Sequence, residues 1–313
     1  MQKYFRRGIC DRSDGWRVTK VDAVYNLIPY IMRTRMDSQN LFEENIPLDP
    51  IESFIREHRE DMPDLSVMQV IMAATVRLLS QRPYLNRFVI WNKIYARNHI
   101  KISLMIKRKQ SNEETTIIPE FEPDATLYDV MDKISSEVNK NIAEGVKNGT
   151  DNTTGAFGRL PPFLVRFAVW MLFKLDALGL LPKALTNVSP FHTSVFITNV
   201  GSLGIGPIYH HLYEFGTCSM FIAMGSKHKV RTLSGESDRG DHRFIGLKFV
   251  TDERICDGQY YAYSMRVFRR LLANPAQLLV PPEHVVVDDG VGKRRIDLPC
   301  DSKGKEKKEN ADD

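Results

Sequence analysis

The irregular order of helix and strand patterns is the feature that most restricts how this chain can fold. Apolar residues recur at helical spacing over 22–36, 49–60 and 65–82, and strand-like runs then follow with turn-prone residues between them. Further strand-like runs, at 192–206, 217–226 and 242–252, precede a closing helix. Irregular mixing of strands and helices without an internal repeat favours an α+β fold with one mixed sheet.

Individual helices carry recognisable end signals. Asp22 precedes the first helical pattern as an N-cap, and Pro83 stops the third because its ring cannot continue a helix. Thr126 and Asp129 have the spacing of a capping box at the start of another helix. These signals predict where three helices begin or end.

Composition restricts the class of protein. A chain of 313 residues with 42% hydrophobic content can bury a substantial core, and we expect one domain over 1–282 followed by a charged, disordered tail over 283–313. A formal charge of +4, without a long basic run outside the tail, favours neither nucleic acid nor a membrane as partner. Four widely spaced cysteines and a polar N-terminal stretch favour a reducing, cytoplasmic setting.

The most apolar stretch is "LPPFLVRFAVWMLFKLDALGLLP" at 160–182. Arg166, Lys174 and Asp176 interrupt it, and charged residues near the centre of a membrane-spanning helix cost a few kcal/mol each. A buried or interface helix is the favoured interpretation, and in-plane contact with a membrane is the alternative.

Two familiar types of site are not supported by the spacing of their residues. Glycines at 201, 204 and 206 lack the Lys-Ser/Thr that completes a phosphate-binding loop, so a turn after a strand explains them better. His210, His211 and Cys218 do not have a metal-ligand spacing, because adjacent histidines cannot share one face of a helix or strand. We therefore expect no metal.

The turn "TDERICDG" at 251–258 resembles a motif of a known family. The catalytic cores of the dihydrolipoyl acyltransferases of 2-oxo acid dehydrogenase complexes, related in fold to chloramphenicol acetyltransferase, carry Asp-His-Arg-x-x-Asp-Gly there. Asp252, Arg254, Asp257 and Gly258 match at the same spacing, whereas Glu253 stands at the position of the family's catalytic His.

Further landmarks of that family follow in the same order. They are "RMDS" at 35–38, "PYLN" at 83–86, "TTIIPEF" at 115–121 and "FITNVGSLG" at 196–204. The resemblance covers roughly residues 22–276, and the apolar segment at 160–182 departs from it.

The resemblance implies a mixed sheet flanked by helices and a homotrimer with active sites in tunnels between subunits, where coenzyme A enters from one end. The family's His takes the proton of a thiol that attacks a thioester, and a hydroxyl of a Ser/Thr-Asn pair steadies the oxyanion. Thr198 and Asn199 occupy that pair here. The family's turn Asp pairs with an early Arg, a structural role that carries over to Asp257 and Arg35, with Gly258 completing the turn.

Glu253 decides between two hypotheses. A free Glu titrates near pH ~4.3 and a thiol near ~8.5, so proton transfer from thiol to carboxylate is uphill by about 6 kcal/mol, against about 3 for His. Burial in an apolar tunnel can close that gap. The leading hypothesis is a CoA-dependent acyltransferase with Glu253 as an altered base, and the alternative is a non-catalytic trimeric scaffold or ligand-binding relative.

Two details complete these expectations. Cys256 could carry an acyl group only if it were reactive, and a buried thiol is inert. Only about twenty residues precede the region of resemblance, with no lipoyl domain among them. We therefore expect the acyl group to arrive as free acyl-CoA or on a carrier supplied in trans, and the acceptor is unknown.

Overall fold

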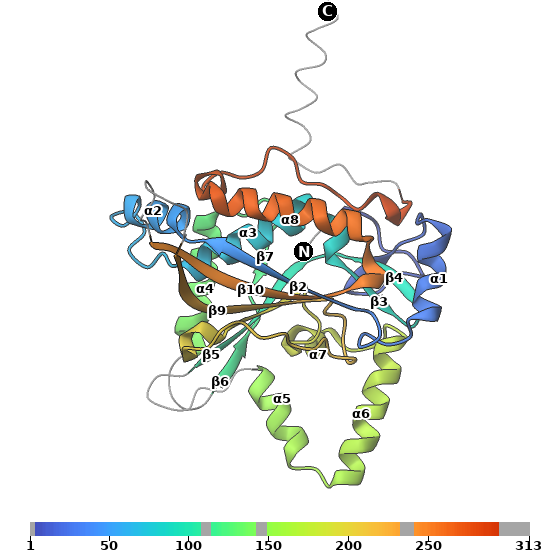
Figure 1. Cartoon of the computed structure of the whole chain (residues 1–313). Helices are drawn as coiled ribbons and strands as arrows, with labels where there is room; N and C mark the ends of the chain where they lie inside the picture. Colours follow the sequence, from blue (N-terminus) through green and yellow to red (C-terminus); the bar gives the residue numbers. More distant parts are fainter. Residues whose placement is uncertain (1–3, 108–113, 142–148, 232–240, 294–313) are drawn as a thin grey trace, which may run out of the picture.

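A mixed sheet lies beneath the long helix α8 (Gly258–Ala273) in the computed structural model, which describes residues 4–107, 114–141, 149–231 and 241–293 (Figure 1). β8 is parallel to both of its neighbours, and the other pairings are antiparallel. The expected α+β fold with one mixed main sheet is confirmed. Across the sheet, the strands are β2 (Gln39–Pro47), β10 (Asp241–Asp252), β9 (Met220–Arg231), β8 (Val195–Asn199), β5 (Ile100–Lys107) and β6 (Glu114–Ile117), with β7 (Glu120–Phe121) paired to β5.

A smaller antiparallel sheet stands beside the first. It has the order β1 (Gly15–Arg17), β4 (Lys93–Arg97) and β3 (Arg87–Ile90). The β3–β4 hairpin turns through Trp91 and Asn92, whose φ angles of 47° and 58° lie in the left-handed region used by tight two-residue hairpin turns. The 3₁₀ turn η1 (Pro83–Asn86) leads into β3.

Helices cover one face of the main sheet. α3 (Val67–Gln81) is buried throughout 69–80 and packs against both α8 and α4 (Leu127–Asn141). α2 (Asp49–Glu57) contacts α3 and α8, and the 3₁₀ turn η4 (Pro275–Leu278) closes the layer. The fully buried Phe268 of α8 meets Phe249 of β10 edge to face, with ring centroids 5.8 Å apart.

The predicted helix ends agree with the structure. Asp22 caps α1 (Ala23–Ile31) by accepting a hydrogen bond from the backbone of Val24 at 3.0 Å. α3 stops at Gln81, before Pro83. Thr126 and Asp129 bond reciprocally, at 2.7 Å from the Thr126 amide to the carboxylate and 3.3 Å from the Asp129 amide to the hydroxyl. Local capping chemistry therefore sets these boundaries.

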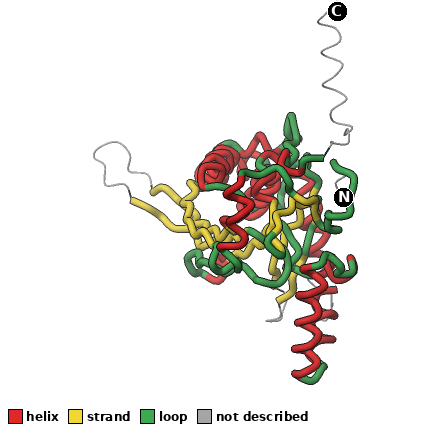
Figure 2. Tube along the Cα trace, turned by 90° about the vertical axis from the view of Figure 1, so that its right-hand side faces the viewer, coloured by secondary structure: helices red, strands yellow, loops and turns green. Residues whose placement is uncertain are grey.

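The apolar segment at 160–182 is not buried within the chain. α5 (Gly149–Gly158) and α6 (Pro162–Ala177) form a helical hairpin that projects from the rest of the molecule in both views, and the short α7 (Lys183–Val188) follows at its base (Figures 1 and 2). Most large apolar side chains of α6 are exposed. The prediction that this helix is buried in the chain's own core is therefore wrong. The prediction that it lies at an interface is not tested by a single chain.

The C-terminal boundary of the domain also needs correction. Residues 283–293, which we expected in the tail, pack on the domain up to the 3₁₀ turn η5 (Asp289–Val291). Asp288 is buried and pairs with Arg87 of β3 at 2.6 Å. The charge-rich remainder at 294–313 lies outside the described residues, so the boundary predicted at 282 falls too early.

Replacing Phe249 tests the contact between α8 and the sheet. Phe249 is fully buried and stacks on Phe42 with ring centroids 4.8 Å apart. Phe249→Ala should lower the free energy of unfolding by about 3–5 kcal/mol, because it removes a large side chain and leaves a cavity. Tyr263→Ala, on the exposed side of α8, should change it by no more than about 0.5 kcal/mol. Denaturant unfolding that ranks the two variants the other way would contradict this packing.

Candidate active site at the end of β10

The turn that follows β10 is held by backbone bonds to two distant segments. The Asp252 amide donates to the Ser219 carbonyl at 3.0 Å, and the Glu253 amide donates to the Ser38 carbonyl at 2.8 Å. The chain then forms the 3₁₀ turn η3 (Glu253–Ile255) before α8 begins. The position of Glu253 is therefore fixed by the start of β2 and by the start of β9.

Asp252 is the centre of the turn's side-chain interactions. Its carboxylate is fully buried and receives a two-pronged contact from Arg254, with Nε at 2.8 Å and Nη2 at 2.7 Å. The Arg254 amide and the Ser38 hydroxyl donate to the same carboxylate, each at 3.1 Å. A buried carboxylate with this many donors is paired, so its desolvation cost is offset.

Arg35 lies next to this carboxylate and holds the loop before β9. Its two terminal nitrogens donate to the carbonyls of Val89, Tyr213, Glu214 and Gly216 at 2.7–3.0 Å. Its Nε lies 4.0 Å from Asp252 Oδ2. Burial lowers the pKa of Arg35, and the Asp252 charge acts against that shift.

The predicted ion pair between Asp257 and Arg35 is therefore wrong. Asp257 is exposed and caps α8, accepting a hydrogen bond from the Tyr260 amide at 2.6 Å. Gly258 is the first residue of the helix. The carboxylate that faces Arg35 belongs to Asp252, because η3 carries the chain out toward solvent before Asp257.

Glu253 is in a different environment from its neighbour Asp252. Its side chain is partly exposed and, within the described parts of the chain, forms neither a hydrogen bond nor an ion pair. Tyr25 of α1 lies close to the turn. Burial raises the pKa of its phenol, and Asp257, Cys256 and Glu253 raise it further. No sequence motif selects Tyr25, since α1 meets the turn only through the tertiary fold.

Cys256 is buried beneath the turn. Burial raises the pKa of its thiol well above the ordinary range. A thiol in this environment is a poor nucleophile, in line with the expectation that Cys256 carries no acyl group.

Thr198 and Asn199 end β8 on the other side of β9. Thr198 lies beside Ala223 of β9. β10 runs antiparallel to β9, and Glu253 comes after the β10 residue that pairs with Met220, the first residue of β9. Measured along β10, Glu253 thus lies about five residues, or ~17 Å, beyond the level of Thr198. The Thr198 hydroxyl has no hydrogen-bond partner in the described ranges, and Asn199 Oδ1 accepts from the Ser202 amide at 3.3 Å in the 3₁₀ turn η2 (Val200–Leu203). One chain does not bring these groups together.

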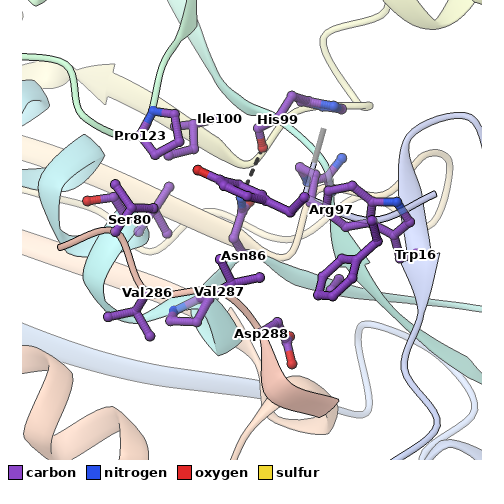
Figure 3. Close-up of a pocket in the computed structure, with 16 residues that line it drawn as sticks. Trp16, Ser80, Asn86, Arg97, His99, Ile100, Pro123, Val286, Val287 and Asp288 are labelled. Atoms are coloured by element: carbon purple, nitrogen blue, oxygen red, sulfur yellow. Dashed lines mark hydrogen bonds between the residues drawn. The ribbon is translucent and has the colours of Figure 1, made fainter. Parts of the chain in front are cut away.

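A cavity of about 40 Å³ lies elsewhere, between β4, the end of α3 and residues 285–288 (Figure 3). Asn86 donates to the carbonyl of His99 at 2.9 Å beside it. Burial holds the pKa of His99 well below its ordinary value, so this imidazole is neutral. The cavity has room for water, and its lining includes no residue of the turn at 252–258.

Two alanine substitutions test which carboxylate supports the turn. Asp252→Ala should lower the free energy of unfolding by about 3–5 kcal/mol, because it leaves the buried Arg254 and Arg35 without their anion. Asp257→Ala removes only a helix cap and should cost about 1 kcal/mol. Thermal and denaturant unfolding should separate the two variants clearly. Equal losses, or a larger loss for Asp257→Ala, would contradict the assignment.

No family model matches the sequence, and no curated protein matches it significantly. Among solved structures, the chain is similar to a probable dihydrolipoamide acetyltransferase from Listeria monocytogenes, at 12% identity and a TM-score of 0.49 over 81% of this chain and 92% of the other. It is also similar to a truncated catalytic core of the 2-oxoacid dehydrogenase multienzyme complex from Thermoplasma acidophilum (12% identity, TM-score 0.49, 82% and 98% covered). A chloramphenicol acetyltransferase is similar at 9% identity and a TM-score of 0.48, with 81% and 96% covered.

Proposed function

We propose that the protein is a CoA-dependent acyltransferase that uses Glu253 of one subunit together with Thr198 of a neighbouring subunit. The proposal rests on the difference between the two adjacent carboxylates of the turn, those of Asp252 and Glu253. Asp252 is buried and fully paired, whereas the adjacent Glu253 carboxylate is held in place by its backbone and remains free of hydrogen bonds and ion pairs in the described ranges. A fixed carboxylate without a structural partner is available to accept a proton.

The separation of the two groups supports a shared site. The offset of ~17 Å along the strands is too large for one substrate carbonyl to contact both Glu253 and Thr198 of the same chain. A closed ring of identical subunits can place the end of β8 from one chain against the turn of the next. A homotrimer, the assembly implied by the sequence resemblance, satisfies this requirement.

The reaction then needs one proton acceptor and one hydrogen-bond donor. Glu253 takes the proton of the acceptor thiol or hydroxyl, and the resulting nucleophile attacks the carbonyl carbon of the acyl-CoA thioester. The Thr198 hydroxyl donates to the tetrahedral oxyanion. The carbon–sulfur bond breaks, the coenzyme A thiolate leaves, and the proton returns to it from Glu253. No covalent lipoyl group is required.

The main obstacle to this mechanism is that a carboxylate is a weak base. Moving a thiol proton to an ordinary Glu costs about 6 kcal/mol. Because Glu253 remains partly exposed in the single chain, the desolvation that reduces this cost has to come from the neighbouring subunit and the substrate. The same exposure favours the competing function, a trimeric scaffold or binding protein that retains the fold without the proton acceptor.

Variants at Glu253 separate the two functions. Glu253→Gln keeps the shape but cannot accept a proton, so transfer of acetyl from acetyl-CoA to a dithiol should fall by about 10²–10⁴-fold. Glu253→His should raise the rate, since imidazole is the stronger base near neutral pH. Glu283→Gln, at an exposed position outside the turn, should leave the rate unchanged. Thiol release and coenzyme A affinity are measured in parallel.

The scaffold function gives a different pattern. Wild type and Glu253→Gln would then be equally inactive with every short-chain acyl-CoA, and Glu253→His would gain nothing. That result would overturn the acyltransferase proposal even if coenzyme A still bound.

The oligomeric state tests the shared site separately. Sedimentation velocity and equilibrium at micromolar concentration should show a trimer, because the site is incomplete in one chain. A stable monomer that nevertheless transfers acyl groups would exclude the division of Glu253 and Thr198 between subunits.

A further inference from the structure

The helical hairpin exposes apolar side chains over most of the circumference of α6. Phe163, Phe167 and Trp170 are 70%, 59% and 56% exposed and form one stripe along the helix, since residues three and four apart share a face. Flanking positions widen this stripe. The better covered positions of α6 are Val165, Ala168, Leu172, Leu175, Asp176 and Ala177. We call the exposed arc the α6 apolar surface; its other large members are Leu164, Val169, Met171 and Phe173.

The charges that accompany this surface have one sign. Arg159, Arg166 and Lys174 are exposed. Asp176, the only acidic residue between 159 and 177, is 2% exposed and turned away from the surface. Its carboxylate lies 2.7 Å from Arg12 and 3.3 Å from His192. The α6 apolar surface therefore presents aromatic and aliphatic side chains, and Arg166 and Lys174, which lie among them, are the exposed charges along α6.

We propose that the α6 apolar surface docks in the plane of an anionic lipid bilayer. An exposed helix that carries Trp and Phe together with Lys and Arg has the side chains that bind the boundary between headgroups and acyl chains. No helix among the described residues is long and apolar enough to cross a membrane. α6 has 16 residues and spans about 24 Å, less than the ~30 Å of a bilayer's hydrocarbon core.

This proposal reverses the sequence-based expectation that membrane contact is disfavoured. That expectation favoured a buried or interface helix over in-plane contact with a membrane, and in the structure the hairpin projects from the domain and is not buried in it (Figures 1 and 2). The anchored base supports a docking role, because the buried Arg12–Asp176–His192 contacts fix the end of α6 to the body. The proposal is independent of the proposed acyl transfer.

A lipid surface suits this patch better than a second copy of the chain. Lys174 lies within the exposed arc, and Lys is depleted at protein interfaces. At a bilayer, the long side chains of Lys and Arg can reach the phosphate groups while their methylene stems remain in the apolar layer. Contact between two identical basic surfaces would also bring like charges together.

Vesicle co-sedimentation of the full chain tests the proposal. Binding to phosphatidylcholine vesicles that contain phosphatidylglycerol should be strong, and binding to phosphatidylcholine alone should be weaker by tenfold or more. Raising the salt concentration should reduce the difference, because it screens the basic residues. No binding to the anionic vesicles at low salt would overturn the proposal.

Substitutions locate the contact. Phe167→Ser combined with Trp170→Ser should weaken vesicle binding by about tenfold or more, and Arg166→Gln combined with Lys174→Gln by about fivefold per charge removed. Trp91→Ser is the matched control, since Trp91 is 62% exposed but lies in the β3–β4 hairpin. Circular dichroism and melting curves confirm that each variant is folded. Equal binding by the control and the hairpin variants would overturn the assignment.

Tryptophan fluorescence gives a second readout. On anionic vesicles the emission should shift to shorter wavelength, and Trp170→Phe should abolish the shift while Trp91→Phe should not. If the hairpin substitutions instead dissociate the oligomer in lipid-free solution without affecting vesicle binding, a second copy covers the surface and the lipid proposal fails.

Discussion

The buried carboxylate of Asp252 is the interaction on which the candidate site depends. It accepts hydrogen bonds from Arg254 and Ser38 and lies beside Arg35. Arg35 in turn donates to carbonyls of β3 and of the loop at 213–216. One anion thus connects the segment before β2, the end of β10, the turn η3 and, through Arg35, the loop before β9. Because both arginines are buried, removal of this anion would leave two positive charges in a medium that solvates them poorly.

That arrangement explains why adjacent acidic residues can differ so much. Asp252 supports the fold, and its charge is already used by neighbouring donors. Glu253 is positioned by the same turn but is not needed to hold it, so its carboxylate is free for chemistry. In the proposed acyl transfer, a Glu253 backbone fixed by this turn would reduce the entropy cost of reaching a reactive geometry.

Local signals in the sequence were sufficient for much of the fold. The caps at Asp22 and Thr126, the stop before Pro83 and the irregular order of strands all act over a few residues, and each agrees with the structure. The partner of Arg35 was wrongly predicted because Asp252 and Asp257 both belong to the motif. Which of them faces inward depends on the path of η3, and no spacing rule specifies that path.

The apolar segment at 160–182 shows a second limit. A helix that is apolar on all sides has to be covered, but its sequence does not say whether the cover is the same chain, another chain or lipid. The inward orientation of Asp176 was likewise invisible, since its partners Arg12 and His192 are distant in sequence. The long-range pairing of Asp176 with Arg12 and His192 holds the end of α6 against the body of the domain.

Subunit mixing tests the central claim most directly. Chains carrying Glu253→Gln and chains carrying Thr198→Val should each have little acyltransferase activity alone. If each site takes Glu253 from one subunit and Thr198 from the next, trimers reassembled from an equal mixture should recover about a quarter of the wild-type activity, because about one site in four then combines both intact residues. Active wild-type protein whose mixed variants recover no activity would contradict a site shared between subunits.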